Sequence, residues 1–203
     1  MVTEIRIYLE GGGDKSHTKT AIREGFTKFL QPQQAAARQL RFRVIPCGSR
    51  NDAFANFTKA LRDHPEAALI LLVDSEAPVM GGRWDHLQKQ DGWRPGKLSD
   101  NVCHFMVQSI EAWLVADPET LGAYYGQGFN QNALPKRKDV EAIPKDQLLQ
   151  RLNRATAKTQ KGSYKKIHHC ADLLARLNRD RIRQRAKHCD LLFGTLESLI
   201  QQS

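Results

Sequence analysis

Carboxylate side chains follow two hydrophobic segments of the sequence, at the points where β-strands would end. Glu10 closes the segment IRIYLE, and Asp74 and Glu76 follow the apolar run 67–73. Because ligands of an open α/β sheet bind beyond the carboxyl ends of its strands, we expect these three side chains to share one site. Carboxylate oxygens are the ligands that hard divalent cations such as Mg²⁺ and Mn²⁺ prefer. The sequence therefore indicates metal-dependent chemistry on a phosphate backbone.

The surroundings of these acids leave two interpretations open. Three glycines follow Glu10, and they would let a phosphate or a metal ion come close to the backbone. The stretch GGGDKS lacks the spacing of a P-loop, so we do not predict a nucleotide-binding loop of that type. Asp74 and Glu76 would repel each other unless a cation lay between them. The alternative is that all three are solvated acids at strand ends and in loops.

The elements expected around these acids alternate between strands and helices. Residues 3–9 and 40–44 alternate apolar with polar side chains, and 67–73 is a continuous apolar run, as in a strand buried on both faces. Helical spacing of apolar residues follows in 22–30 and again after Asn51, which we predict as a helix cap. This βαβαβ order predicts a doubly wound α/β fold with a mainly parallel sheet.

The second half of the chain is expected to be mostly helical. Residues 75–101 are rich in glycine and read as a long loop, 102–107 as a fourth strand and 108–116 as a helix. Beyond residue 118 the best helix candidates are 146–158, 165–178 and 189–201. We therefore predict an α/β domain at 1–117 and a basic helical extension at 118–203 that closes over the acidic edge.

The positive charge of the chain is concentrated in that extension. The net charge is +9, and residues 136–188 hold sixteen Lys and Arg against five acids, which leaves −2 for the rest. Such a distribution is typical of proteins that bind a polyanion such as nucleic acid. Within it, Lys161, Tyr164, Lys165 and His169 form a basic and aromatic stretch that could hold a phosphate. The alternative is a solvated helical surface, with His169 packed or exposed and no nucleic-acid partner.

Composition argues against a membrane protein and against zinc or redox motifs. No segment approaches the roughly 18 apolar residues of a membrane span, and the N-terminus lacks a signal-peptide layout. The four cysteines form no CxxC pair, so we expect free thiols. We expect a cytoplasmic protein.

Four segments stand out along nearly the whole chain, and the last two are more specific than the first two: IYLEGGGD, LLVDSEAPV, MVQSIEAWLVADPE and KGSYKKIHHCADLLARLNRDRIRQRAKHCDLLF. In these segments the chain resembles the DUF4276 family, whose members are grouped with Toprim-like nucleases of prokaryotic defence loci. A Glu-Gly pair after the first strand and an acid-x-acid pair after the third are also similar to the Toprim fold of topoisomerases, bacterial primases and OLD-family nucleases.

The resemblance implies roles for four acids in a Toprim-like sheet with a helical C-terminal extension. Glu10 would be a metal ligand or the general acid/base, Asp74 and Glu76 would hold Mg²⁺, and Glu111 would be a fourth catalytic acid. Most Toprim domains carry Asp at both positions of the pair, whereas this sequence has the longer Glu76. From the sequence pattern alone, Glu111 is equally well a surface or capping acid.

We therefore expect a Mg²⁺- or Mn²⁺-dependent nuclease that hydrolyses phosphodiester bonds, acting in anti-phage defence with an AAA- or ABC-type ATPase partner. The alternative is a non-catalytic subunit that binds or senses nucleic acid within an ATPase complex. The longer Glu76 favours this alternative, and the retention of all three acids opposes it. A third hypothesis is hydrolysis or transfer on a small phosphate substrate.

Overall fold

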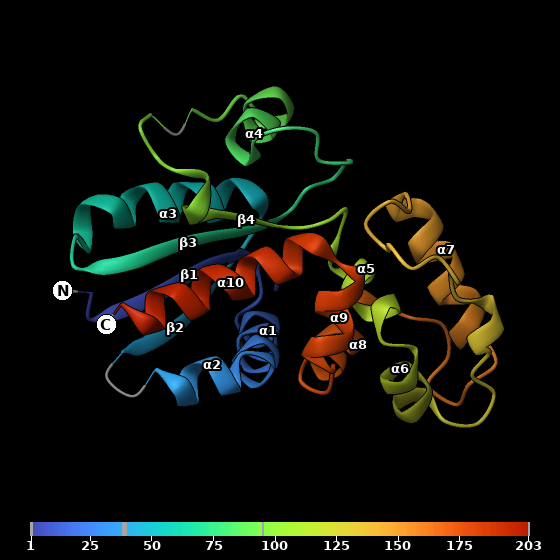
Figure 1. Ribbon diagram of the computed structural model, residues 1–203. Helices are drawn as coiled ribbons and strands as arrows, with labels where there is room; N and C mark the ends of the chain where they lie inside the picture. The colour runs from blue at the N-terminus through green and yellow to red at the C-terminus, as the bar shows by residue number, and fades with distance from the viewer. Residues whose placement is uncertain (1, 38–39, 95, 203) are drawn as a thin grey trace.

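A parallel β-sheet lies at the centre of the computed structural model, which describes residues 2–37, 40–94 and 96–202 (Figure 1). In this part of the chain the sheet has four strands in the order β2-β1-β3-β4, and every neighbouring pair is parallel. The predicted α/β class and doubly wound sheet are confirmed. The strands are β1 (Glu4–Glu10), β2 (Arg41–Gly48), β3 (Ala67–Asp74) and β4 (Cys103–Met106).

Helices connect the strands and make up most of the chain after β4. Two 3₁₀ turns, Asp100–Val102 and Gln131–Ala133, accompany them. The helices are α1 (Ser16–Phe29), α2 (Gln31–Ala36), α3 (Arg50–Asp63), α4 (Arg83–Asp91), α5 (Ile110–Ala116), α6 (Pro118–Tyr125), α7 (Lys145–Thr156), α8 (Lys166–Leu174), α9 (Arg179–Arg185) and α10 (Lys187–Gln201).

Alternating side chains divide the core into two layers, one on each face of the sheet. Ile70 and Leu72 of β3 pack with α1 and α10, whereas Leu71 and Val73 pack with α3 and α4. Figure 1 shows α3 and α4 on one side of the strands and α1 on the other. The apolar run of β3 is thus explained by burial on both faces, because successive strand side chains point in opposite directions.

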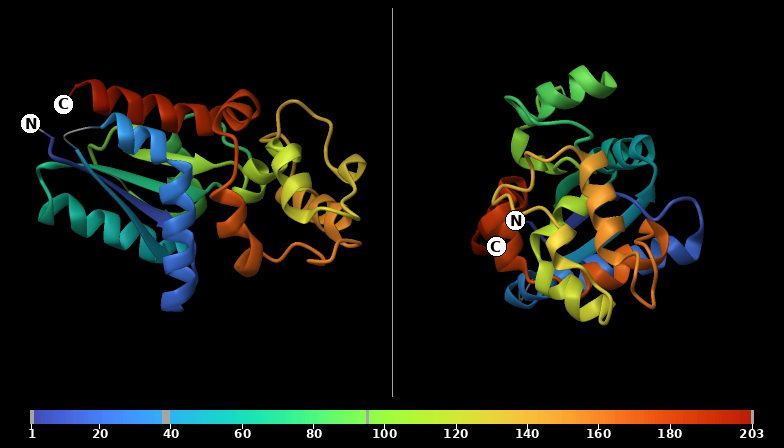
Figure 2. Two further views of the ribbon diagram at one scale, coloured as in Figure 1. Left: turned by 90° about the horizontal axis from the view of Figure 1, so that it is seen from below. Right: turned by 90° about the vertical axis from the view of Figure 1, so that its right-hand side faces the viewer.

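The last helix, α10, packs against the sheet and against α1, so the C-terminal part of the chain contacts the N-terminal part. Phe193 of α10 meets Phe29 of α1 edge to face, with ring centroids 5.6 Å apart, and Phe29 also lies 5.6 Å from Trp113 of α5. Both termini lie near one end of the sheet, and α5 to α7 lie at the other end (Figures 1 and 2). Residues of 1–117 and of 118–203 therefore share one hydrophobic cluster.

Two local predictions are wrong. The cap of α3 is Ser49, whose hydroxyl accepts a hydrogen bond from the Asp52 backbone N–H at 3.1 Å, rather than Asn51. The predicted loop 75–101 contains α4, which was missed because only Trp84, His86 and Leu87 of this polar helix are buried. The fourth strand and the helix after it appear at 103–106 and 110–116, close to their predicted places.

The structure also answers two expectations about membrane-spanning helices and about the cysteines. Among the described residues, none of the helices is both long and apolar enough to cross a bilayer. All four cysteines are buried and free, as predicted.

Replacement of Phe193 tests how strongly α10 is held on the sheet. We expect Phe193→Ala to lower the free energy of unfolding by about 3–5 kcal/mol, because it leaves a cavity between α10, Phe29 and the strands. Leu191 on the same helix is 39% exposed. Leu191→Ala should therefore change the free energy of unfolding by less than about 1 kcal/mol. Urea unfolding of both variants measures the difference, and equal losses would contradict this role of Phe193.

Candidate metal centre

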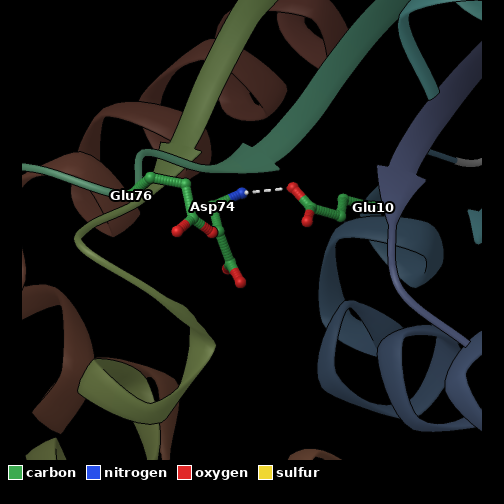
Figure 3. Close-up of side chains that lie close together, drawn as sticks. All are labelled: Glu10, Asp74 and Glu76. Carbon is green, nitrogen blue, oxygen red and sulfur yellow. Dashed lines mark hydrogen bonds between the residues drawn. The ribbon is translucent and has the colours of Figure 1, made fainter. Parts of the chain in front are cut away.

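Three acids meet at the carboxyl edge of the sheet. Glu10 ends β1, Asp74 ends the neighbouring strand β3, and Glu76 follows two residues later. One carboxylate oxygen from each lies within 4.8 Å of the others. Figure 3 shows the three side chains converging from these separate segments. The three acids thus lie together at the edge where the sequence pattern placed them, and their role as a metal or catalytic site stays a prediction.

Glu10 is held by contacts from both neighbouring strand ends. Its Oε2 accepts a hydrogen bond from the Asp74 backbone N–H at 3.2 Å, drawn as the dashed line in Figure 3. Arg50 Nη1, at the carboxyl end of β2, lies 3.4 Å from the same oxygen. Burial raises the pKa of Glu10 above its ordinary value, against the opposing charge of Arg50.

Asp74 is the most deeply buried acid of the three. Its Oδ1 accepts a hydrogen bond from the Ile110 N–H at 2.9 Å, and its Oδ2 lies 3.2 Å from Lys166 Nζ. Burial raises the pKa of Asp74 to about 7, with Lys166 opposing the shift and Glu10 and Glu111 adding to it. A further cation nearby would lower this pKa and stabilise the ionised form of the carboxylate.

Glu76 adopts a backbone conformation that is unusual for a residue with a side chain. Its φ is 63°, in the left-handed region, which costs about 1 kcal/mol or more for an L-residue other than glycine. The Glu76 N–H donates to the Gln108 carbonyl at 2.9 Å, and the carboxylate forms an ion pair with Lys145. This turn points the exposed Glu76 side chain back toward Asp74 and Glu10 (Figure 3).

Glu111 lies beside this group, at the start of α5. It is buried, and its Oε1 accepts a hydrogen bond from the Tyr164 hydroxyl at 3.1 Å. Its Oε2 lies 3.8 Å from Lys166 Nζ, so Lys166 bridges Glu111 and Asp74. The structure places the predicted fourth acid next to the cluster rather than among the three converging oxygens.

Three cations that the sequence analysis missed surround the acids: Arg50, Lys145 and Lys166. Arg50 also binds both oxygens of Asp91 at 2.8 Å, and its guanidinium lies 5.2 Å from the centre of the Trp93 ring. The only sequence signal for Arg50 is its place just after the second strand. Lys145 and Lys166 come from distant helices. Lys166 falls inside the predicted basic stretch 161–169 but was not singled out there, and the sequence around Lys145 gives no such signal.

The residues predicted to contact phosphate lie in different surroundings. Tyr164 is buried against Glu111. His169 Nδ1 accepts hydrogen bonds from the Tyr125 hydroxyl at 3.0 Å and the Lys165 N–H at 3.1 Å, while Lys161 Nζ lies 5.1 Å from the Tyr124 ring centre. It is Lys166, adjacent to the exposed Lys165, whose ammonium reaches the acids.

Part of the positive charge of the extension is engaged inside the protein. Arg181 pairs with Asp117 and Glu119, and Arg183 pairs with Asp190 and Glu197. Arg185 donates to the carbonyls of Val115 and Ala116 at 3.2 and 2.9 Å. These arginines connect the helices to one another. The number of Lys and Arg in the extension therefore overstates the positive charge that is free to contact a polyanion.

The donor set fits a hard divalent cation. All three converging ligands are carboxylates, and the raised pKa values of Glu10 and Asp74 show that the nearby cations do not fully offset their burial. Mg²⁺ and Mn²⁺ bind one or more carboxylates of this kind and keep positions for water or phosphate oxygens.

A family model described as "Domain of unknown function (DUF4276)" matches residues 9–197. The chain belongs to this family. The match spans all three acids and confirms the resemblance found in the sequence. Neither a curated protein nor a solved structure matches the chain. The relationship of DUF4276 proteins to Toprim nucleases stays a prediction.

The raised pKa of Asp74 predicts how pH changes the stability of the metal-free protein. The folded state holds the Asp74 proton up to about pH 7, whereas the unfolded chain releases it near its ordinary value of 3.8, so stability from this group falls as pH rises between those values. Asp74→Asn lacks this proton. The variant should therefore gain stability relative to wild type between about pH 4 and pH 7, measured by urea unfolding in EDTA. If the difference in unfolding free energy between the variant and wild type does not change with pH, the raised pKa of Asp74 is contradicted.

Proposed function

We propose that this protein hydrolyses phosphodiester bonds of nucleic acid with a bound Mg²⁺ or Mn²⁺ ion. The observation that carries the proposal is the convergence of Glu10, Asp74 and Glu76 at the carboxyl edge of the sheet, with their oxygens within 4.8 Å. Ligands of open α/β sheets bind at this edge. Cations next to the acids, above all Lys166, add the positive charge that a phosphate requires.

The acids and cations have distinct roles in this proposal. Glu10, Asp74 and Glu76 would hold the ion, which would polarise the phosphate and lower the pKa of a bound water. Lys166 Nζ lies between Asp74 and Glu111 and can hold a phosphate oxygen while its charge develops. Arg50 fixes Glu10 and donates to the Asp74 carbonyl, so it positions the acids rather than touching the substrate.

The contact between Lys145 and Glu76 favours a second candidate, a non-catalytic subunit that binds nucleic acid. The Lys145 ammonium forms an ion pair with one of the three converging acids, and a cation would have to compete with it. In that candidate the acids never load a metal and Lys145 stays in place. A partner ATPase and a role in anti-phage defence stay predictions under both candidates.

A cleavage assay on single-stranded and duplex DNA and RNA with Mn²⁺ or Mg²⁺ tests the proposal. We expect Glu10→Gln and Asp74→Asn each to lower the rate by at least about 10³-fold, because each removes a charged ligand oxygen. The matched control is Glu24→Gln, which changes an exposed acid on α1 and should cleave like wild type.

Calorimetry with Mn²⁺ separates the two candidates. Metal binding that is lost in Glu10→Gln and kept in Glu24→Gln supports the metal centre, even where cleavage requires a partner. Wild type that neither binds Mn²⁺ nor cuts any substrate would contradict the nuclease and support the binding subunit.

Two neighbouring lysines test the role of Lys166. Lys166→Met should lower kcat by about 10²-fold and leave Mn²⁺ binding intact or tighter, because the ammonium stabilises charge on the phosphate and competes with metal for Asp74. Lys165→Met changes the exposed neighbour, which the sequence pattern also favoured for phosphate. Because it is the Lys166 ammonium that reaches the acids, the Lys165 variant should leave kcat within a few-fold of wild type. The same kcat in both variants would rule out this role for Lys166.

A further inference from the structure

A cavity of about 660 Å³ opens directly beside the acids. Glu10, Asp74 and Lys166 form part of its wall, so anything bound in it lies next to the proposed metal centre. Its volume lies within the range of pockets that hold a small molecule. One nucleoside fits a space of this size, and a stretch of duplex does not.

The inner wall of the cavity is apolar and comes from two helices that are far apart in sequence. Ile22 of α1 is half-buried in this wall and packs against the buried Phe26, Leu174 and Ile110 behind it. The two helices touch at Gly25, where an added Cβ would lie 2.7 Å from the Ala171 carbonyl oxygen. This contact holds α1 and α8 together beside the cavity, and the apolar wall suits the flat face of a base.

The rim of the cavity is polar and carries charges of both signs. Lys15, His17 and His168 line it together with Asp14, and α1 begins there with no acid in its first turn. The positive end of the α1 dipole therefore adds to the charge of Lys15. Ile167, also in the lining, is 73% exposed and adds apolar surface to the rim. A polar rim with the cations Lys15 and Lys166, beside a partly apolar interior, suits a nucleotide, which joins an anionic phosphate to an apolar ring.

We propose that this cavity receives one unstacked nucleotide of a single strand, with its phosphate at Lys166 and the acids. This inference rests on the proposed function and names its substrate class: single-stranded or locally opened nucleic acid. A duplex must first extrude a base, which costs unstacking energy and lowers its affinity. A base held against apolar side chains needs no sequence readout, so binding depends on the presence of a base and not on its identity.

Ala21 lines the cavity and offers a way to fill it. Ala21→Trp places a large side chain in the space meant for the base, and Ala21→Leu fills less of it. Thr20→Trp is the matched control, because Thr20 is an exposed neighbour on the same helix and outside the cavity lining. Melting temperatures close to wild type show that each variant folds.

Fluorescence anisotropy with phosphorothioate-protected strands, with and without Mn²⁺, measures the affinities. We expect wild type to bind a single strand at least tenfold more tightly than the duplex and than an abasic strand of equal length. Ala21→Trp should lose at least tenfold on the single strand, with a smaller loss for Ala21→Leu, and Thr20→Trp should bind as wild type does. In cleavage, Ala21→Trp should raise KM more than it lowers kcat.

Any one of the following outcomes would overturn the inference. The duplex or the abasic strand could bind as tightly as the single strand, or Ala21→Trp could bind like Thr20→Trp. Tight binding of AMP or dAMP without binding of any strand would assign the cavity to a small substrate instead. Cleavage lost in Glu10→Gln but unaffected by Ala21→Trp would leave the nuclease standing and reject only the nucleotide cavity, whereas equal cleavage by Glu10→Gln and wild type would reject the nuclease.

Discussion

Repulsion among closely spaced carboxylates is the constraint on which the rest of the structure depends. Glu10, Asp74 and Glu76 bring their oxygens within 4.8 Å of one another, and Glu111 lies close by. Burial raises the pKa of Asp74 to about 7, so the cluster disfavours its own ionised form. Such an arrangement lowers the stability of a metal-free protein, which natural proteins accept mainly at functional sites. A divalent cation would offset this repulsion.

The cations that partly offset the repulsion also connect distant parts of the chain. Arg50 joins the end of β2 to α4 through Asp91 and to the acids through Glu10. Lys145 and Lys166 bring the starts of α7 and α8 to the same edge. These two ion pairs place the first residues of α7 and α8 against the acidic edge. Metal binding at the acids would compete with Lys145 and Lys166 for the carboxylates.

The sequence predicted what depends on local pattern and missed what depends on distant contacts. Strand alternation and the apolar run 67–73 predicted the parallel sheet, and the position of Glu10 and Asp74 at strand ends predicted their meeting. Arg50 and Lys166 were missed because a lysine or arginine in sequence carries no sign of the carboxylate it will contact. Helix α4 was missed because its polar composition resembles that of a loop. The turn at Glu76 was missed because its positive φ depends on a contact with a residue distant in sequence, the Gln108 carbonyl.

Anomalous diffraction from crystals grown with Mn²⁺ tests the central claim most directly. The account predicts a single strong peak between the carboxylates of Glu10, Asp74 and Glu76, with the Lys145 ammonium moved away from Glu76. A map without a peak at this edge, in which Lys145 and Lys166 still contact Glu76 and Asp74, would contradict it and leave the acids as a cluster neutralised by the protein alone.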